Sequence, residues 1–303
     1  MATFIVTGPN GQVGSHLIPH LLMMGDEVVG LGRRATDFSH PKYSHIVDEL
    51  SDAEHIAKVL SSKEIDAIIH LAWAGSAGIE RGDLAIQKAN VQMTLEMAKL
   101  ALLLKAKFVG VGTISESEIF LDTVDTNGLA YIYGSAKDEA RRATLELLQK
   151  ATPQAETING SYSWIRLGNT YGGDDPHTSD RFIYGILRDC IAGKDLSLST
   201  MDQWYDFVHI EDAINGIREV GLRGTSLLPY YVGSGRPQPM RSYIEEVHRV
   251  VESSSVLTFD RPYGGSRLPK SAFSTKQLEN DTNFRAQKDF GTEMGLIGSE
   301  LRT

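Results

Sequence analysis

The chain has 303 residues, of which 41% are hydrophobic and 23% are charged, and its formal net charge is −9 at pH 7. This composition is sufficient for a buried core, and the length accommodates one large domain or two modest ones. The negative charge disfavours nucleic acid or an anionic membrane as a main partner, and the single cysteine excludes an intrachain disulfide and a thiolate metal cluster.

Short apolar strands alternate with helices in the N-terminal half. We predict strands over residues 3–7, 27–31, 46–47, 65–71 and 108–111, and helices over 12–24, 53–60 and 83–105. This alternation is typical of a doubly wound parallel sheet, so we expect an α/β fold. The first strand begins almost at Met1, which leaves no room for a signal peptide, and no apolar run approaches transmembrane length. We therefore expect a cytoplasmic protein that has no membrane partner and no metal site.

The pattern becomes less regular in the C-terminal half. We predict a helix that runs to Gln149 and whose first turn contains Tyr133 and Lys137, in the stretch 131–137. A strand over 163–167 and helices over 181–192, 213–220 and 240–252 follow. Asp212 is the expected N-cap of the helix at 213–220. We expect residues 1–165 plus about 206–236 to form the sheet domain. Residues of about 166–205 plus 237–303 then form a smaller C-terminal lobe.

A glycine-rich turn joins the first strand to the first helix. Gly8, Gly11 and Gly14 follow the pattern G-x-x-G-x-x-G. Such glycines permit a tight turn and close approach of a pyrophosphate, while the helix N-terminus supplies N–H donors. The alternative is an ordinary glycine-rich turn, but a strand before it and an amphipathic helix after it favour dinucleotide binding in a Rossmann-type sheet. The predicted cofactor site includes the intervening residues Asn10, Gln12 and Val13.

The end of the second strand indicates which dinucleotide binds. An NAD site places an acidic residue there for the ribose 2′-hydroxyl, whereas this chain has Gly32, Arg33 and Arg34. Two guanidinium groups favour a 2′-phosphate, so we expect NADP(H), with NAD(H) as the other possibility. The alternative is two solvated surface arginines. Asp48, beside Glu49 after the third strand, is either an acceptor for the adenine amino group or a turn residue.

Tyr133 and Lys137 are spaced four residues apart, which places both side chains on one face of a helix. A tyrosine normally loses its proton near pH 10, so catalysis near neutrality requires nearby positive charge. Lys137 and an oxidised nicotinamide both provide it, and Lys137 is also expected to hold the nicotinamide ribose. Thr113, at the end of the strand at 108–111, is the expected hydroxyl partner for the substrate oxygen. The alternatives are that Thr113 only caps local backbone, and that Tyr133 and Lys137 only pack or carry surface charge.

The chain resembles the extended short-chain dehydrogenase/reductases, especially the nucleotide-sugar epimerases, dehydratases and reductases. The resemblance spans most of the chain and rests on six motifs in order: Thr7-Gly8-x-x-Gly11-x-x-Gly14, Ile69-His-Leu-Ala72, Asn90, Tyr133-x-x-x-Lys137, Arg166-Leu-Gly-Asn-Thr-Tyr-Gly172 and Asp206-Phe-Val-His-Ile-Glu-Asp212. It implies that Thr113, Tyr133 and Lys137 are catalytic. It also implies that Leu71 and Ala72, with Trp73 and Asn90, belong to the cofactor site, and that Asn169 touches the substrate.

Two departures from the family pattern bear on the substrate. Sugar dehydratases of this family carry an acidic residue directly after the active-site threonine, whereas Glu116 comes later here, so dehydration is disfavoured. Many members place an arginine before the Asp-Phe of the last motif, where it binds a nucleotide phosphate. This chain has Tyr205 there, after Trp204. Arg236 or Arg267 is the expected substitute, and the two aromatic residues either stack on a base or pack.

The leading hypothesis is an NADPH-dependent reductase of a nucleotide-linked 4-keto-deoxy sugar. The alternatives are an NAD(P)-dependent nucleotide-sugar epimerase, a reductase of small carbonyl compounds and a dinucleotide-sensing protein without catalysis. The substrate in the first two cases is a small molecule, a nucleotide sugar. Related enzymes pair two helices across a two-fold axis, so we expect a homodimer through the helices at 83–105 and 137–149. Ordinary packing of these helices on the sheet is the alternative.

Overall fold

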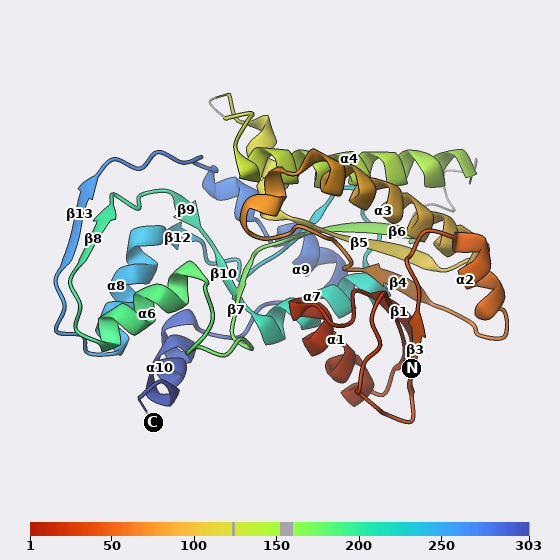
Figure 1. Ribbon diagram of the computed structural model, residues 1–303, viewed down its shortest axis with the longest axis horizontal. Helices are drawn as coiled ribbons and strands as arrows, with labels where there is room; N and C mark the ends of the chain where they lie inside the picture. Colours follow the sequence, from red (N-terminus) through yellow and green to blue (C-terminus); the bar gives the residue numbers. More distant parts are fainter. Residues whose placement is uncertain (123–124, 152–159, 303) are drawn as a thin grey trace.

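A seven-stranded parallel sheet forms the centre of the computed structural model, which describes residues 1–122, 125–151 and 160–302 (Figure 1). The strand order is β11-β6-β5-β4-β1-β2-β3. The strands are β1 Thr3–Thr7, β2 Glu27–Gly32, β3 Tyr43–Val47, β4 Ala67–His70, β5 Lys107–Thr113, β6 Tyr162–Leu167 and β11 Tyr230–Val232. The chain builds the sheet outward from β1 in both directions, with β2 on one side and β4 on the other. Doubly wound sheets bind ligands at such a switch point, at the carboxyl ends of the strands.

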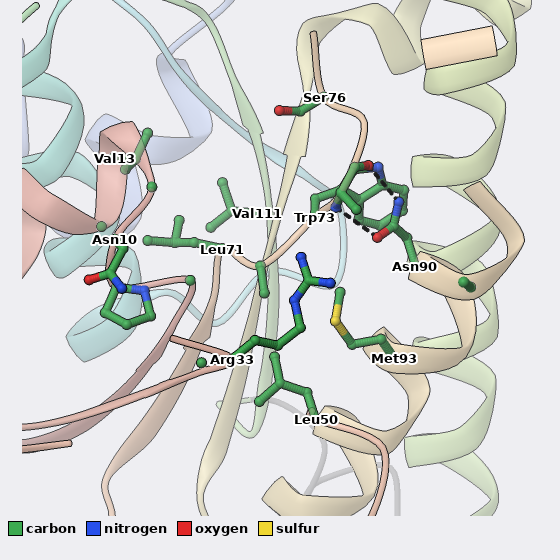
Figure 2. A pocket seen from close by; sticks show the side chains of 18 of the residues that line it. Asn10, Val13, Arg33, Leu50, Leu71, Trp73, Ser76, Asn90, Met93 and Val111 are labelled. Atoms are coloured by element: carbon green, nitrogen blue, oxygen red, sulfur yellow. Dashed lines mark hydrogen bonds between the residues drawn. The ribbon is translucent and has the colours of Figure 1, made fainter. Parts of the chain in front are cut away.

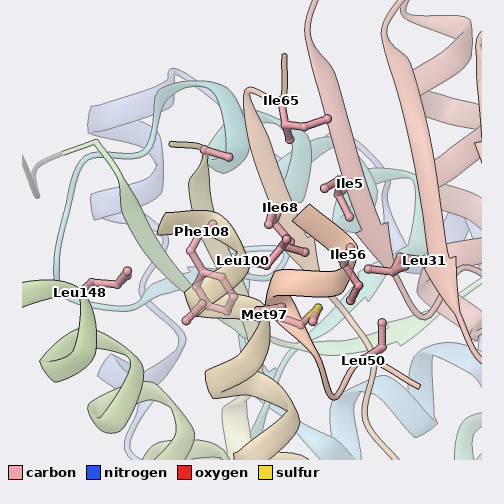
Figure 3. Close-up of a cluster of buried hydrophobic side chains, with 14 of the residues drawn as sticks. Ile5, Leu31, Leu50, Ile56, Ile65, Ile68, Met97, Leu100, Phe108 and Leu148 are labelled. Atoms are coloured by element: carbon pink, nitrogen blue, oxygen red, sulfur yellow. The ribbon is translucent and has the colours of Figure 1, made fainter. Parts of the chain in front are cut away.

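Helices cover both faces of the sheet (Figure 1). One face carries α2 Ala53–Val59, α3 Leu84–Leu104 and α4 Leu129–Ala151, and the other carries α1 Gln12–Met23, α7 Ile210–Arg223 and α9 Lys276–Thr282. Successive strand residues point to opposite faces, so Ile5 enters the core under α3 (Figure 3) while Phe4 and Val6 enter the core under α1. The apolar run in β1 therefore fits a strand that is buried on both faces.

A smaller, more irregular part of the chain lies beside the sheet (Figure 1, left). It contains α6 Phe182–Ile191, α8 Met240–Val250 and α10 Phe290–Glu300, which share a third core. Three two-stranded sheets pair β7 Asn169–Tyr171 with β10 Phe207–His209, β9 Trp204–Tyr205 with β12 Gln238–Pro239, and β8 Leu196–Ser199 with β13 Leu257–Arg261. Because this part begins directly after β6, it lies at the carboxyl edge of the sheet.

The predicted α/β doubly wound fold is confirmed, with some differences in detail. The helix α4 begins at Leu129, so Tyr133 lies in its second turn, and the third strand begins at Tyr43. The prediction that Asp212 caps a helix is wrong: α7 begins at Ile210 with His209 as its N-cap, and the Asp212 carboxylate accepts the N–H groups at 287 and 288. None of the helices in the described part of the chain is long and apolar enough to cross a membrane.

Candidate active site

A cavity of about 990 Å³ opens at the carboxyl ends of β1, β2, β4 and β5 (Figure 2). With one exception, the residues predicted to bind the cofactor line it: Gly8, Asn10, Gly11, Gln12, Val13, Gly14, Arg33, Arg34, Glu49, Leu71, Ala72, Trp73, Asn90, Tyr133 and Lys137. The exception is Asp48, whose Oδ1 accepts the N–H of Leu50 at 2.7 Å. Asp48 therefore has the geometry of a turn residue.

The glycine-rich turn allows a ligand to approach the backbone closely. Gly8 has a φ of 68°, and a Cβ there would lie 3.0 Å from the backbone of Ala72. A Cβ at Gly14 would lie 2.3 Å from the carbonyl oxygen of Gly8, so a side chain would force the first turn of α1 away from the strand. Gly11, the N-cap of α1, provides no side-chain cap. The N–H groups of the first turn are thus available to a pyrophosphate, and the cavity fits a dinucleotide.

Arg33 and Arg34 stand at the adenosine end that the sequence predicts for this cavity. Figure 2 shows Arg33 extending into the cavity near Leu50 and Met93. Within the described part of the chain, neither guanidinium group forms an ion pair or a side-chain hydrogen bond. The Asn10 amide holds the loop by donating to the carbonyl oxygens of Arg34 at 3.2 Å and of the next residue at 3.3 Å. Two cations without a side-chain partner among the described residues therefore lie at this end of the cavity.

Tyr133 and Lys137 lie at the opposite end of the cavity, one turn apart on α4, with 7% and 4% of their surfaces exposed. The Lys137 ammonium donates to the carbonyl oxygen of Val111 at 2.8 Å and lies 3.8 Å from the centre of the Trp73 ring. Trp73 in turn donates from Nε1 to Gln87 at 2.9 Å and meets the Tyr133 ring edge-on. The indole therefore fixes the position of both side chains.

Asn90 holds the segment that carries Trp73. Its side-chain oxygen accepts the N–H of Ala74 at 2.9 Å, and its side-chain nitrogen donates to the Ala74 carbonyl at 2.8 Å (Figure 2). Both polar atoms of this amide are thus engaged by the backbone. Asn90 lines the cavity, but its hydrogen bonds shape the cavity wall.

Burial determines the protonation of the pair. It raises the pKa of the Tyr133 phenol to about 12, although the nearby Arg81 guanidinium lowers that pKa in part. It lowers the pKa of the Lys137 ammonium to about 7, because a charge without solvent is costly. Near neutrality Tyr133 is consequently a neutral phenol with a proton to donate, and Lys137 gives up its proton more readily than an exposed lysine.

Thr113 ends β5 next to Gly112, which lines the cavity, but Thr113 itself does not line it. Its hydroxyl accepts the N–H of Ser115 at 3.3 Å and caps the 3₁₀ helix η2 Ile114–Phe120. Because this bond uses a lone pair of the oxygen, the hydroxyl proton remains available to a substrate. The structure thus contains the local cap that the sequence left as an alternative, without excluding the catalytic role.

Glu116 is fully buried and does not line the cavity. Its carboxylate accepts the N–H of Thr113 at 2.8 Å, the indole N–H of Trp164 at 3.1 Å and the Arg166 Nε at 3.2 Å. These bonds account for its acceptor capacity within the fold, so Glu116 supports the end of β5. It is not placed to eliminate water from a substrate.

A second cavity, of about 390 Å³, lies between the sheet edge and the smaller part of the chain. Asn169 and Tyr205 line it, as predicted for substrate-binding residues. Several other polar residues that line it were not predicted from the sequence: Arg81, Thr170, Arg181, Gln203 and Tyr263. Arg81 lies on the 3₁₀ helix η1 Gly78–Gly82, after the carboxyl end of β4. A glycine-rich loop at that end of a central strand was the signal available in the sequence.

The other three predicted substrate residues do not line this cavity. The Lys270 ammonium lies 4.8 Å from the centre of the Trp204 ring, which packs in a small apolar cluster. Arg267 forms an ion pair with Asp202 at 2.9 Å. Arg236 is exposed and donates to a backbone carbonyl at residue 288. The expectation that Arg236 or Arg267 replaces the missing phosphate-binding arginine is therefore not supported by their positions.

The sequence profile of the "NAD dependent epimerase/dehydratase family" matches residues 4–226. The chain belongs to this family. CDP-abequose synthase of Salmonella muenchen is 25% identical to the chain over 84% of its length and 83% of the relative's. The NAD(+) form of dTDP-6-deoxy-L-talose 4-dehydrogenase from Aggregatibacter actinomycetemcomitans is 26% identical over 80% and 88%. Among solved structures, UDP-glucose 4-epimerase from Thermotoga maritima, determined with UDP-glucose, aligns with a TM-score of 0.76 and 17% sequence identity. The alignment covers 99% of this chain and 98% of the epimerase chain.

In this member of the epimerase/dehydratase family, a polar cluster connects the two cavities. Gln12, which lines the first cavity, donates to Asp174 at 3.2 Å. Arg181, which lines the second, pairs with the same carboxylate at 2.7 Å and donates to the Gln12 side-chain oxygen. The first turn of α1 is thus tied directly to the second cavity. Among the described residues, no group of three or more histidine, cysteine, aspartate or glutamate side chains could hold a metal ion.

Proposed function

We propose that this enzyme is an NADPH-dependent reductase of the keto group in a nucleotide-linked 4-keto-deoxy sugar. The observation that carries the proposal is the buried pair of Tyr133 and Lys137 at the end of the dinucleotide cavity. A buried phenol that keeps its proton at neutral pH suits protonation of a reduced carbonyl oxygen.

The cofactor would occupy the first cavity, and its nicotinamide would supply the hydride. The first turn of α1 would bind the pyrophosphate, and Arg33 with Arg34 the 2′-phosphate of NADP(H). Lys137 would hold the nicotinamide ribose with the N–H bonds that it does not give to Val111. NAD(H) fits the same turn, and its binding would leave the two arginines without a partner.

The catalytic residues would act on the substrate oxygen. Thr113 would donate its hydroxyl proton in a hydrogen bond that orients the carbonyl. Tyr133 would then transfer its own proton to that oxygen as negative charge develops there. Positive charge from Lys137 would stabilise the phenolate that remains.

The second cavity supports a nucleotide sugar as substrate. Arg81 and Arg181, the latter paired with Asp174 outside the lining, face it, and among the described residues no carboxylate side chain lines it, although the chain as a whole has a net charge of −9. Such a pocket suits the phosphate groups that the names of the CDP- and dTDP-linked relatives specify. We assign Asn169 and Tyr205 to the same substrate, and the segments 166–205 and 237–303 to a substrate-binding lobe. The sheet domain, 1–165 with 206–236, would bind the cofactor.

A nucleotide-sugar epimerase is the second candidate, favoured by the similarity to UDP-glucose 4-epimerase along nearly the whole chain. An epimerase returns the hydride to its substrate and keeps its cofactor, whereas a reductase releases NADP+ at each turnover. Mass spectrometry of the purified protein separates the two. A stoichiometric cofactor that survives dialysis supports the epimerase, and a cofactor that exchanges freely supports the reductase.

The test of the proposed function is single-turnover oxidation of NADPH with a panel of 4-keto sugar nucleotides. Tyr133→Phe keeps the ring and removes the proton, so turnover should fall about 10²–10⁴-fold with little change in cofactor binding. Lys137→Met should impair both turnover and cofactor binding. Thr113→Val should reduce turnover by less than Tyr133→Phe does. Tyr131→Phe, on the same helix, is the matched control and should retain activity. Full activity in Tyr133→Phe would place the acid elsewhere and refute the proposed site.

A further inference from the structure

Arg81 lies at the junction of the two cavities. It lines the second cavity, and its Cζ lies 4.9 Å from the centre of the Tyr133 ring, which lines the first. The side chain is held by a hydrogen bond from Nε to the carbonyl oxygen of Ser76 at 2.7 Å. The guanidinium is therefore fixed against the phenol by its own loop.

Two features of that loop bring Arg81 to this place. Gly75 and Gly78 have φ values of 61° and 59°, which side chains rarely adopt, so the segment between β4 and α3 can turn back toward α4. Gly82 then lies against α4, where an added Cβ would come within 2.7 Å of Leu129. The same helix carries Tyr133, so loop and phenol share one support.

The charged groups around Tyr133 come from three elements. Arg81 on η1 faces the ring, Lys137 on α4 lies 6.0 Å from its centre, and Glu116 on η2 raises the pKa of the phenol. Burial lowers the pKa of the Lys137 ammonium, so its charge is held less firmly than that of an exposed lysine. A guanidinium stays protonated at every pH at which the enzyme works. Arg81 is accordingly a cation beside the phenol whose charge does not depend on burial or pH.

We propose that Arg81 is a positioning residue for the reaction, which holds the Tyr133 ring and stabilises the phenolate that forms when Tyr133 gives up its proton. A cation over an aromatic ring is attracted to the π face, and the attraction grows when the ring becomes anionic. The inference rests on the proposed role of Tyr133 as acid. It adds a second source of positive charge, delivered from the loop before α3.

The test measures the phenol itself. The holoenzyme with bound NADP+ is labelled with ¹³Cζ-tyrosine, and Tyr133→Phe identifies the signal. The oxidised nicotinamide adds positive charge beside the phenol, so the midpoint in the holoenzyme should lie below the pKa of about 12 of the cofactor-free protein, and the signal is followed from pH 7 to pH 11. Arg81→Gln should raise the midpoint of Tyr133 by about 1–3 units, the range for an opposite charge within about 4–6 Å, or move it beyond pH 11. Arg81→Lys should restore part of the shift. Arg267→Gln, an exposed arginine outside both cavities, is the matched control and should leave the midpoint unchanged.

Identical midpoints in the unmutated protein and Arg81→Gln would overturn the inference, as would an unmutated signal that does not move by pH 11. If Arg81→Gln fails to fold, Arg81→Lys carries the test, since a compact ammonium cannot reproduce the planar stacked contact and should still shift the midpoint. No substrate is present in this measurement. A shifted midpoint in a protein that reduces no sugar nucleotide would therefore refute the proposed substrate and leave the role of Arg81 intact.

Discussion

Arg33 and Arg34 should give this enzyme a preference for NADPH over NADH. Both line the dinucleotide cavity, Gly32 supplies no carboxylate to repel a phosphate, and neither guanidinium has a side-chain partner among the described residues. Replacing both with alanine removes the charge and keeps the turn, because Asn10 holds that loop through backbone carbonyls. Arg33→Ala with Arg34→Ala should therefore weaken NADPH binding and leave NADH binding nearly unchanged.

The size of the effect follows from the hydrogen bonds to the 2′-phosphate that the double variant removes. A hydrogen bond to a charged group contributes about 1.5–3 kcal/mol, and about 1.4 kcal/mol corresponds to a factor of ten in affinity. One such ordered bond is thus worth a factor of about 10–150 in the ratio of the two dissociation constants. The double variant should reduce the ratio of the NADH to the NADPH dissociation constant by at least a factor of about 10. This reduction should be smaller at high salt because Arg33 and Arg34 are exposed.

Fluorescence titration with each reduced cofactor measures both constants on the same protein. Arg249→Ala, which removes an exposed arginine remote from the cavity, is the matched control and should leave the ratio unchanged. Equal or tighter binding of NADH by the unmutated protein would refute the reasoning. The two arginines would then be solvated surface residues, and the reductase proposal would lose its main support over the epimerase.

Three further predictions concern stability and assembly. Folding lowers the pKa of Lys137 from 10.5 to about 7, so between these pH values the unfolded chain binds more protons than the folded one, and this lysine destabilises the cofactor-free protein. Lys137→Met should therefore raise the free energy of unfolding, and by more at pH 7 than at pH 10. Urea titrations at the two pH values measure the difference. Glu116→Ala should cost about 3–5 kcal/mol by the same assay because it leaves buried donors unpaired, whereas Glu118→Ala should cost clearly less. Leu84 and Leu103 of α3 are 63% and 52% exposed, so we expect a homodimer through α3 and α4; a monomer mass by light scattering at micromolar concentration would contradict it.

The parts of the site that depend on short-range spacing could be predicted from the sequence. The glycine turn is a local feature, so its residues line the cavity as expected. Tyr133 and Lys137 share a helix face because they are four residues apart, whichever turn of α4 they occupy. The strands β1, β2, β4 and β5, whose ends form the cavity, could also be predicted, since each is a short apolar run.

The residues of the second cavity come from separate segments that only the tertiary fold brings together, so fewer of them could be predicted from the sequence. Arg236 and Arg267 were reasonable candidates as arginines in the right region, but the fold gives each a different partner. Arg81 was overlooked because it lies in the half of the chain that the prediction assigned to the cofactor. The η1 loop brings it to the substrate side by crossing over the start of α4; the glycines of the loop mark a turn in the sequence, but they do not show which element the loop packs against.

Tyr205 shows how the fold can compensate for a departure from the family pattern. An arginine is common at this position in similar enzymes, and its absence weighs against a phosphate-bearing substrate when the sequence is considered alone. In the structure Tyr205 lines the second cavity as a half-buried neutral phenol, because desolvation raises its pKa to about 12. The guanidinium groups of Arg81 and Arg181 line the same cavity from two other elements. Arg181 is already paired with Asp174, whereas Arg81 has no carboxylate partner among the described residues. Under the proposed function Arg81 would therefore supply the positive charge for a phosphate that residue 205 does not provide.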